Sequence, residues 1–541
     1  MNSLFLIFGA IVVFVIAYVT YGSWLAKQWG IDINRKTPAH TKYDNIDYVP
    51  ADARVLLGHH FSSIAGAGPI TGPILASIFG WLPVYLWIIV GSVFVGGVHD
   101  FGALFASIRH EGKSIGEIIR TTLGVKGKKL FNIFAWATLI LVVAAFTDIC
   151  ASTFAYNPKD ITGAQAGTAS LLFIVLAMLF GFFVYRKGAK LSVATVVGVI
   201  LLFFCVWIGY KYPVVQLSKF QWNIVLIIYI TLASILPVWI LLQPRDYLCS
   251  FLLYAMLIGG LIGIFITHPS IEIPAFVGFT VKNQTLFPFL FVTVACGAVS
   301  GFHALVGSGT SSKQLNNEKD SKFVGYGAML IEGLVAVVAL VAVGYVAKAE
   351  GTPANIFAGG LAHFMNSFGL PVEIGKVFVI LAFSAFALTS LDTATRIGRY
   401  IFQEFFDEAT EGVKKIGQNI YVSTIITVAA SCGILAYGYS KIWPIFGSAN
   451  QLLAALALLA LTSWFVTMGK KTIMVLLPMI LMFCVTLSAL VLLIKQYIFG
   501  ATTNYILGIF AIILFVLAII LLIEAFTVFI KKKNYKNTKS M

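Results

Sequence analysis

Several ionisable side chains lie inside long stretches of the chain that are otherwise apolar. Those that we single out first are His99, Asp100, Asp392 and Arg396. A charge within the hydrocarbon core of a bilayer is costly unless it is paired or hydrated, so such residues mark functional sites by default. Carboxyl groups can carry protons or cations, and imidazole titrates near neutral pH. We therefore interpret Asp100 and Asp392 as proton or cation carriers, with His99 as a relay.

The segment around Asp392 has one polar face on an apolar helix. Thr389, Asp392, Thr393 and Arg396 recur at i, i+3, i+4 and i+7, which places them on one side of a helix. Two interpretations of Asp392 stay open: a coupling carboxylate, or one half of an internal ion pair with Arg396. The hydroxyls of Thr389, Ser390 and Thr393 could also ligate sodium, so the coupling ion is H+ or Na+.

Two apolar segments cannot be regular helices. Residues 58–73 combine several glycines with Pro69, Pro73 and two histidines, and residues 296–310 repeat the pattern of Gly-x-His followed by Gly-x-Gly. Proline removes a backbone donor, and glycine relaxes the backbone. Irregular backbone at membrane depth is tolerated where it lines a cavity, and facing broken segments are typical of transporters with inverted halves. We expect another break near Leu236–Pro237.

Broken helices can bind an anion, because the N-terminal end of a half-helix has free N–H groups and a partial positive charge. A solute with a carboxylate suits such a site. The predicted substrate-binding residues are Gly58, His59, His60, Ser62, Ser63, Gly66, Gly68, Ser300, Gly301, His303, Asn450 and Gln451. Asn450 and Gln451 have an alternative role, because polar side chains also join membrane helices.

Composition places these segments in a polytopic membrane protein. The 541 residues are 59% hydrophobic and 11% charged, whereas soluble domains are about 25% charged. A water-soluble enzyme is therefore excluded. Runs long enough to cross a bilayer predict about 15 transmembrane helices, near residues 3–26, 58–80, 82–106, 129–152, 164–186, 189–211, 222–243, 246–267, 286–311, 326–347, 377–400, 418–438, 443–468, 473–494 and 504–530. We interpret the first as a retained span and not as a cleaved signal.

The basic residues predict the orientation of the spans. With the tail Lys531–Lys533 on the cytoplasmic side, about 29 of the 37 Lys and Arg residues fall in cytoplasmic loops. This places the N-terminus outside and the C-terminus in the cytoplasm. The net charge of +15 is dispersed over short loops, which excludes a nucleic-acid partner and leaves the lipid bilayer as the surrounding phase.

No cofactor is expected. The six cysteines are scattered singly through apolar segments, and phosphate-binding or hydrolase motifs are absent. A metal site built from His59, His60, His99, Asp100 and His303 is chemically possible, so a metal-dependent membrane enzyme is one alternative. We expect no enzyme, and no metal.

The chain closely resembles the carbon starvation protein A family of bacterial inner-membrane transporters. The resemblance rests on five motifs, at residues 58–69, 99–101, 301–306, 391–399 and 446–453. It implies import of small peptides, or of pyruvate in some members, during carbon starvation, coupled to protons. His99 stands where other members have a different polar residue, which puts a general role of that histidine in doubt.

The resemblance also implies the amino acid, polyamine and organocation (APC) transporter fold, with two inverted five-helix halves. A seven-span repeat that pairs the second span with the ninth is the alternative. We divide the chain into a first span and loop (1–57), a transporter core with breaks near 58–73 and 297–310 (58–468), and a C-terminal hairpin with a basic tail (469–541).

In the predicted mechanism, half-helix N–H groups hold a substrate carboxylate, and protonation of Asp100 or a nearby histidine permits the swing between orientations. A channel would let the solute pass without such a swing, and a nutrient sensor would need an output domain. Both remain as rival interpretations of the function. The sequence assigns no oligomeric state.

Overall fold

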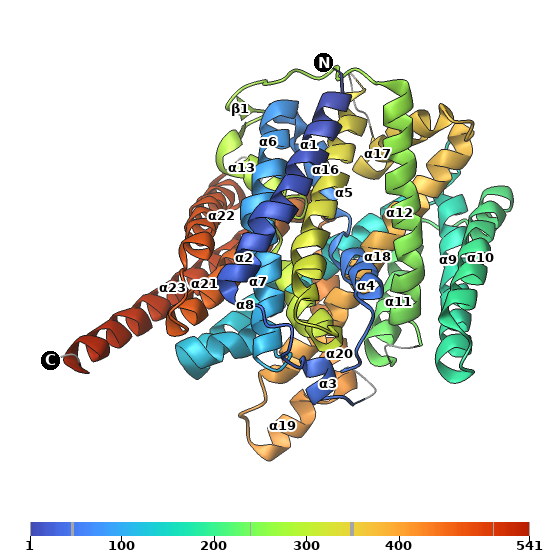
Figure 1. Ribbon diagram of the computed structural model, residues 1–541. Helices are drawn as coiled ribbons and strands as arrows, with labels where there is room; N and C mark the ends of the chain where they lie inside the picture. The colour runs from blue at the N-terminus through green and yellow to red at the C-terminus, as the bar shows by residue number, and fades with distance from the viewer. Residues whose placement is uncertain (1, 45–47, 238–239, 347–350, 501–502, 540–541) are drawn as a thin grey trace.

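The structure is a computed structural model, and it describes residues 2–44, 48–237, 240–346, 351–500 and 503–539. Most of these residues are helical, and the two short strands pair as a hairpin (Figure 1). The α-helices of the first half are α1 (Leu4–Ala17), α2 (Ser23–Trp29), α3 (Pro38–Thr41), α4 (Ala53–Ile64), α5 (Gly68–Ala76), α6 (Trp81–Gly91), α7 (Gly97–Arg109), α8 (Ile115–Phe154), α9 (Thr162–Gly181), α10 (Leu191–Lys211), α11 (Lys219–Ile235) and α12 (Leu242–Thr267).

The second half begins with the hairpin. Its elements are β1 (Thr280–Val281), β2 (Gln284–Thr285), α13 (Leu286–Thr293), α14 (Gly301–Val306), α15 (Ser312–Gln314), α16 (Ala328–Gly344), α17 (Pro353–Asn366), α18 (Val372–Glu404), α19 (Glu411–Gly417), α20 (Ile420–Leu435), α21 (Tyr439–Thr467), α22 (Ile473–Phe499) and α23 (Tyr505–Lys539). Single turns of π-helix join several of them, and a 3-10 turn (Ser77–Phe79) follows α5.

Within the described ranges, 11 helices are long and apolar enough to cross a membrane, and two bent pairs raise this number to 13. The remaining two predicted spans correspond to α11 and to the interrupted α13–α14 segment. The 17 residues of α11 extend only about 25 Å at ~1.5 Å per residue, less than a bilayer core of roughly 30 Å. The predicted class, an all-α polytopic membrane protein, is confirmed.

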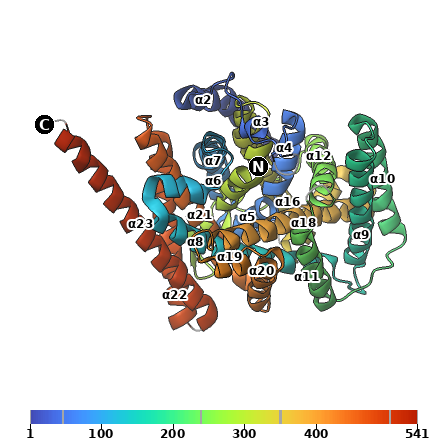
Figure 2. The same cartoon turned by 90° about the horizontal axis from the view of Figure 1, so that it is seen from below.

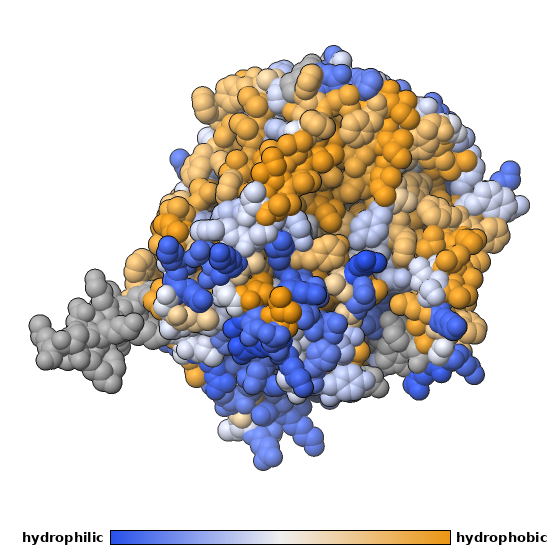
Figure 3. Space-filling model, viewed as in Figure 1, coloured by the Kyte–Doolittle hydropathy of each residue, from blue (hydrophilic) through white to orange (hydrophobic). Residues whose placement is uncertain are grey.

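The most buried helices form the centre of the bundle. In the most apolar windows of α8, α18 and α21, 83%, 89% and 100% of residues are buried. Helices α9 and α10 lie at one edge of the bundle, and α22 and α23 at the opposite edge (Figure 2). On the side shown in Figure 3, apolar residues cover the upper part of the surface and hydrophilic residues gather at the lower end, around α3 and α19. Such an apolar belt suits a lipid environment.

The first predicted break occurs where the glycines and prolines stand. Helix α4 ends at Ile64, the chain bends by 45°, and α5 begins at Gly68 with Pro69 in its first turn. Proline is suited to this position, because the first N–H groups of a helix have no partner within the helix. The bend contacts α18, where the Ser390 hydroxyl donates a hydrogen bond of 3.0 Å to the carbonyl of Ser63. A side-chain donor thus satisfies a carbonyl left free at the end of α4.

The second break, residues 294–300, crosses the first. A Cβ atom on Gly68 would overlap Sγ of Cys296, and one on Gly297 would lie 3.5 Å from the Cα of Pro69. The two irregular segments therefore touch directly, as expected for inverted halves. This contact pairs the second predicted span with the ninth. When the peripheral hairpin α9–α10 is set aside, four predicted spans lie between the two breaks.

Candidate functional site

The carboxylate of Asp100 bridges two histidines at the centre of the bundle. Oδ1 lies 2.7 Å from Nδ1 of His99, and Oδ2 lies 2.8 Å from Nδ1 of His303. Asp100 is on α7 and His303 is in the second broken segment, so the pair ties one to the other. All three side chains are excluded from solvent. The sequence singles out these residues as ionisable groups at membrane depth, and the structure adds that they contact one another.

Close packing of α7 against the second break makes this contact possible. A Cβ atom on Gly96, just before α7, would overlap the carbonyl oxygen of Ala298. The hydroxyl of Ser92 donates a hydrogen bond to the carbonyl of Gly297. Ser92–Gly96 is a π-helical turn, a feature that frequently occurs at functional sites.

A second carboxylate completes this group. Oε2 of Glu332, on α16, lies 3.4 Å from Nε2 of His303, and neither carboxylate oxygen of Glu332 has a hydrogen-bond partner among the described residues. A buried carboxylate without a partner is costly unless it binds a proton or a cation. We call His99, Asp100, His303 and Glu332 the Asp100 cluster.

Asp392 belongs to a different group. Its Oδ2 accepts hydrogen bonds from the guanidinium of Arg245 and from the hydroxyl of Tyr229, the latter at 2.8 Å. Nη2 of Arg245 also lies 3.0 Å from Oδ1 of Asp246. The ionisable side chains of Arg245, Asp246 and Asp392 are almost completely buried. Among the described residues Asp392 makes no ion pair with Arg396, so that predicted alternative is wrong.

Arg396 instead binds the end of α11. Its Nη2 donates to the carbonyls of Ala233, at 2.7 Å, and Leu236. Arg399 donates to the carbonyl of Ser234. Cations near the last carbonyls of a helix are favourable, because these groups carry a partial negative charge. The predicted break at Leu236–Pro237 is thus present as the end of α11, and positions 238–239 lie outside the described residues.

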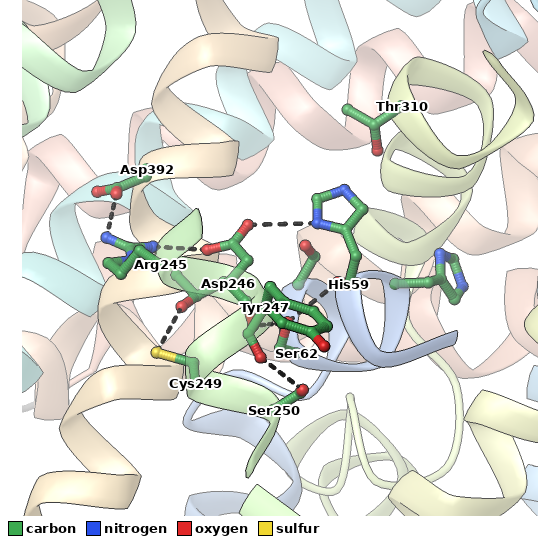
Figure 4. Close-up of polar contacts among 12 residues, drawn as sticks. His59, Ser62, Arg245, Asp246, Tyr247, Cys249, Ser250, Thr310 and Asp392 are labelled. Carbon is green, nitrogen blue, oxygen red and sulfur yellow. Dashed lines mark hydrogen bonds and ion pairs between the residues drawn. The ribbon is translucent and has the colours of Figure 1, made fainter. Parts of the chain in front are cut away.

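His59 also belongs to the second group. Its Nδ1 lies 3.5 Å from Oδ2 of Asp246, and its side chain is 11% exposed, whereas that of Asp246 is fully buried. Figure 4 shows Asp246 between Arg245 and His59. The hydroxyl of Ser62 donates to the carbonyls of His59 and Asp246, and so joins α4 to α12. We call His59, Tyr229, Arg245, Asp246 and Asp392 the Arg245 cluster.

The remaining predicted oxygen ligands lie close to this cluster on α18. The hydroxyl of Thr389 donates to the carbonyl of Ala385 and contacts Sγ of Cys249 at 3.8 Å. Thr393 is buried. Ser63 has a buried hydroxyl without a hydrogen-bond partner among the described residues. Of the predicted sodium ligands, Ser390 thus contacts the first break directly, and Thr389 and Thr393 are buried on the same helix.

His60 follows His59 on α4 and is directed at the second broken segment. Its Nδ1 lies 2.7 Å from the hydroxyl of Ser311, and its Nε2 has no hydrogen-bond partner within the described part of the chain. His60 therefore links α4 to the π-helical turn Gly307–Ser311.

Asn450 and Gln451 hold the second break in place. The Oδ1 of Asn450 accepts a 2.9 Å hydrogen bond from the backbone N–H of Phe302, and its Nδ2 donates to the hydroxyl of Ser300 at 2.9 Å. Nε2 of Gln451 donates to the carbonyl of Phe291 at 2.5 Å. The amides therefore satisfy the backbone on both sides of the break. At the first break, by contrast, the N–H groups of Gly68 and Ile70 have no partner among the described residues.

A vestibule of about 480 Å³ opens at the hydrophilic end of the bundle. Its lining includes Lys113, Lys313, Ser308 and Gly309. The last two residues belong to the π-helical turn Gly307–Ser311, whose last residue contacts His60. The vestibule thus leads from one surface toward the histidines of the first broken segment.

Comparison with known protein families shows to which family the chain belongs. The model of the family "Carbon starvation protein CstA" matches residues 2–352 and 345–489. The chain belongs to this family. A CstA relative from Bacillus subtilis (strain 168), named a peptide transporter, is 34% identical over 85% of this chain and 84% of its own length. The pyruvate/proton symporter BtsT of Escherichia coli (strain K12) is 33% identical over 84% of this chain and 76% of its own length.

The fold of this CstA-family chain is also found in a solved transporter. A mutant manganese transporter from Eremococcus coleocola, which is APC-like, superimposes with a TM-score of 0.51 over 91% of this chain and 99% of that one, at 11% identity. At this identity the similarity shows the fold alone. The APC-type fold expected from the sequence is therefore confirmed.

Proposed function

We propose that this CstA-family protein is a proton-coupled secondary transporter that imports small peptides. The observation that carries the proposal is the Asp100–His303 contact, a buried acid–base pair between α7 and a broken segment. Membrane carboxylates paired with histidines occur in proton pathways. In this proposal α7 and the second broken segment move relative to one another during transport. A proton on the Asp100–His303 pair changes the interaction between them, and protonation can drive a conformational switch in this way.

Peptides are the first substrate class because the B. subtilis relative is a named peptide transporter. Pyruvate is the second, because BtsT is a named pyruvate/proton symporter of nearly equal identity. Both substrates have a carboxylate, which the free N–H groups of Gly68 and Ile70 can bind at the start of α5. In this proposal Gly58, His59, His60, Ser62, Ser63, Gly66 and Gly68 contact the substrate. Ser300, Gly301, His303, Asn450 and Gln451 support the site from the second break.

Coupling is assigned to His99, Asp100, Asp392 and the polar face of α18. Sodium stays as the second candidate ion, supported by the hydroxyls near the first break. Residues 58–468 form the transporting core, with residues 1–57 and 469–541 outside it. We place the protein in the bacterial inner membrane with the N-terminus outside, so that the vestibule opens to the cytoplasm.

A metal-dependent membrane enzyme has less support. Among the described residues no three His, Cys, Asp or Glu side chains converge in a way that could hold a metal ion. The B. subtilis and E. coli relatives have the names of transporters. We therefore propose transport without an enzymatic step.

Uptake into proteoliposomes tests the function. Purified protein is reconstituted, and entry of a labelled dipeptide and of labelled pyruvate is measured with an inward proton gradient, with an inward sodium gradient and with neither. We expect the dipeptide to accumulate only with the proton gradient. No accumulation of either substrate under any gradient contradicts the proposal, and accumulation of pyruvate alone reassigns the substrate.

A further inference from the structure

The two clusters are separate units in the structure. No hydrogen bond or ion pair within the described residues joins a member of the Asp100 cluster to a member of the Arg245 cluster. The first cluster connects α7, α14 and α16, and the second connects α4, α11, α12 and α18. Each cluster can therefore hold a proton independently of the other.

Charge counting shows that the Arg245 cluster lacks one positive charge. Asp246 and Asp392 both face the single guanidinium of Arg245, and Tyr229 is neutral. A buried charge without compensation is strongly unfavourable. The cluster is neutral only when one proton or one cation is bound in addition to Arg245.

The geometry locates that proton between Asp246 and His59. Oδ1 of Asp246 is occupied by Arg245, but Oδ2 has no hydrogen-bond partner in the described part of the chain, and neither ring nitrogen of His59 has one. Oδ1 of Asp392 also lacks a partner there, but of the two carboxylates Asp246 is the one with a histidine at ion-pair distance. The 3.5 Å between Oδ2 and Nδ1 is slightly longer than a charge-assisted hydrogen bond. A proton on either atom converts this gap into such a bond.

The neighbouring cations and titratable groups are directed elsewhere. From α18, Arg396 is directed at the carbonyls of Ala233 and Leu236. From α12, Cys249 contacts Thr389, and from α4, His60 contacts Ser311. Of the described residues, Arg245 is thus the one cation paired with these carboxylates.

Access to solvent also differs between the clusters. The side chain of His59 is 11% exposed, while the side chains of Asp100, His303 and Glu332 are at most 1% exposed. The His59 side chain therefore lies nearer the molecular surface than the side chains of the Asp100 cluster, although its two ring nitrogens are buried.

We propose that Asp246 and His59 form a second proton-binding site, distinct from the Asp100 cluster, so that two protons accompany each substrate molecule. The number of protons per substrate molecule rests on the proposed function. The existence of the proton-binding site does not depend on it. In this proposal Asp246 binds the second proton. Arg245 positions Asp246 and also binds Asp392.

The number of protons follows from the substrate gradient at which net flux stops. In proteoliposomes clamped at zero membrane potential, a neutral dipeptide is driven about tenfold per proton by a pH difference of one unit. Wild-type protein is expected to reach about 100-fold accumulation. Asp246→Asn and Asp100→Asn are each expected to reach about tenfold. The matched controls are Asp160→Asn, in an exposed loop, and His40→Gln, at an exposed position of α3. Both should stay at the wild-type value.

A wild-type limit of tenfold overturns the proposal, because it indicates one proton. An Asp246→Asn limit equal to that of the wild type also overturns it. Complete loss of accumulation in both variants also overturns the proposal. It indicates that the two clusters belong to one proton pathway through His60.

A measurement that does not need transport separates this inference from the proposed function. Infrared difference spectra of the purified protein across a pH titration report protonated carboxyl groups. Asp246→Asn is expected to remove one component and Asp100→Asn another. If Asp246→Asn does not fold, His59→Gln is used instead, because it retains the Arg245–Asp246 pair. This variant is expected to shift the titration midpoint of the Asp246 component and to leave that of the Asp100 component unchanged. A spectrum unchanged by either variant excludes the second site, even if transport fails for other reasons.

Discussion

Gly68 of the first broken segment lies directly against Cys296 of the second. A Cβ atom on Gly68 would come within 2.5 Å of the Cβ atom of Cys296, so no side chain other than hydrogen fits. Transporters with inverted repeats bind substrates where their discontinuous helices meet. The contact between these two residues therefore marks the centre of the proposed transport core.

Gly68→Ala is expected to destabilise the protein by roughly 1 to 3 kcal/mol, the usual cost of overpacking. The reason is that the added methyl group meets backbone-proximal atoms of Cys296, which cannot rotate away. Thermal unfolding in detergent measures the change. Gly433→Ala is the control, because a Cβ atom there has nothing within 4 Å. The double variant Gly68→Ala/Cys296→Gly should recover much of the loss, and no recovery would show that the contact is not the cause.

Asp100→Asn is expected to bind substrate and to lose most of its gradient-driven accumulation. An asparagine can still contact His99 and His303 but cannot take up a proton at this position. Binding is measured by substrate-dependent thermal stabilisation, and accumulation by uptake with a proton gradient. Full accumulation by this variant would remove Asp100 from the coupling step.

Arg245→Leu is expected to destabilise the protein by roughly 3 to 5 kcal/mol, the typical effect of removing one partner of a buried ion pair. Asp246 and Asp392 would be left without their counter-charge. In Arg245→Leu/Asp392→Leu one of these carboxylates is removed, so the double variant should be more stable than Arg245→Leu. Equal or lower stability of the double variant, measured by thermal unfolding in detergent, would argue against a direct interaction.

Ser114→Cys tests which side of the membrane the vestibule faces. Ser114 lines the vestibule at its hydrophilic end. In a background with the exposed Cys484 replaced by serine, a membrane-impermeant thiol reagent should label Ser114→Cys in inside-out vesicles and not in right-side-out vesicles. The opposite labelling pattern would invert the proposed orientation.

The sequence predicts the spans and the breaks because these depend on local composition. Gly66, Gly68 and Pro69 interrupt any helix in which they stand, and uncharged runs identify the membrane segments. The pairing of Asp100 with His303 cannot be predicted in this way, because it depends on how residues about 200 positions apart pack. No periodic signal in the sequence records that contact.

Arg245 illustrates why part of the site escapes sequence reasoning. Apolar runs end at residue 243 and resume at residue 246, so the pattern assigns Arg245 to a cytoplasmic loop. In the structure α11 is short and α12 begins at Leu242, which brings Arg245 to Asp392 inside the bundle. Glu332 stands within a predicted span and has no evident role in the sequence, since its neighbour His303 comes from a different segment.

Accumulation of a labelled dipeptide in proteoliposomes with an imposed inward proton gradient tests the central claim most directly. The account predicts that the internal concentration rises well above the external one, and that a protonophore returns it to the external level. Equilibration without accumulation, unaffected by the protonophore, would contradict proton-coupled transport and indicate a passive pathway.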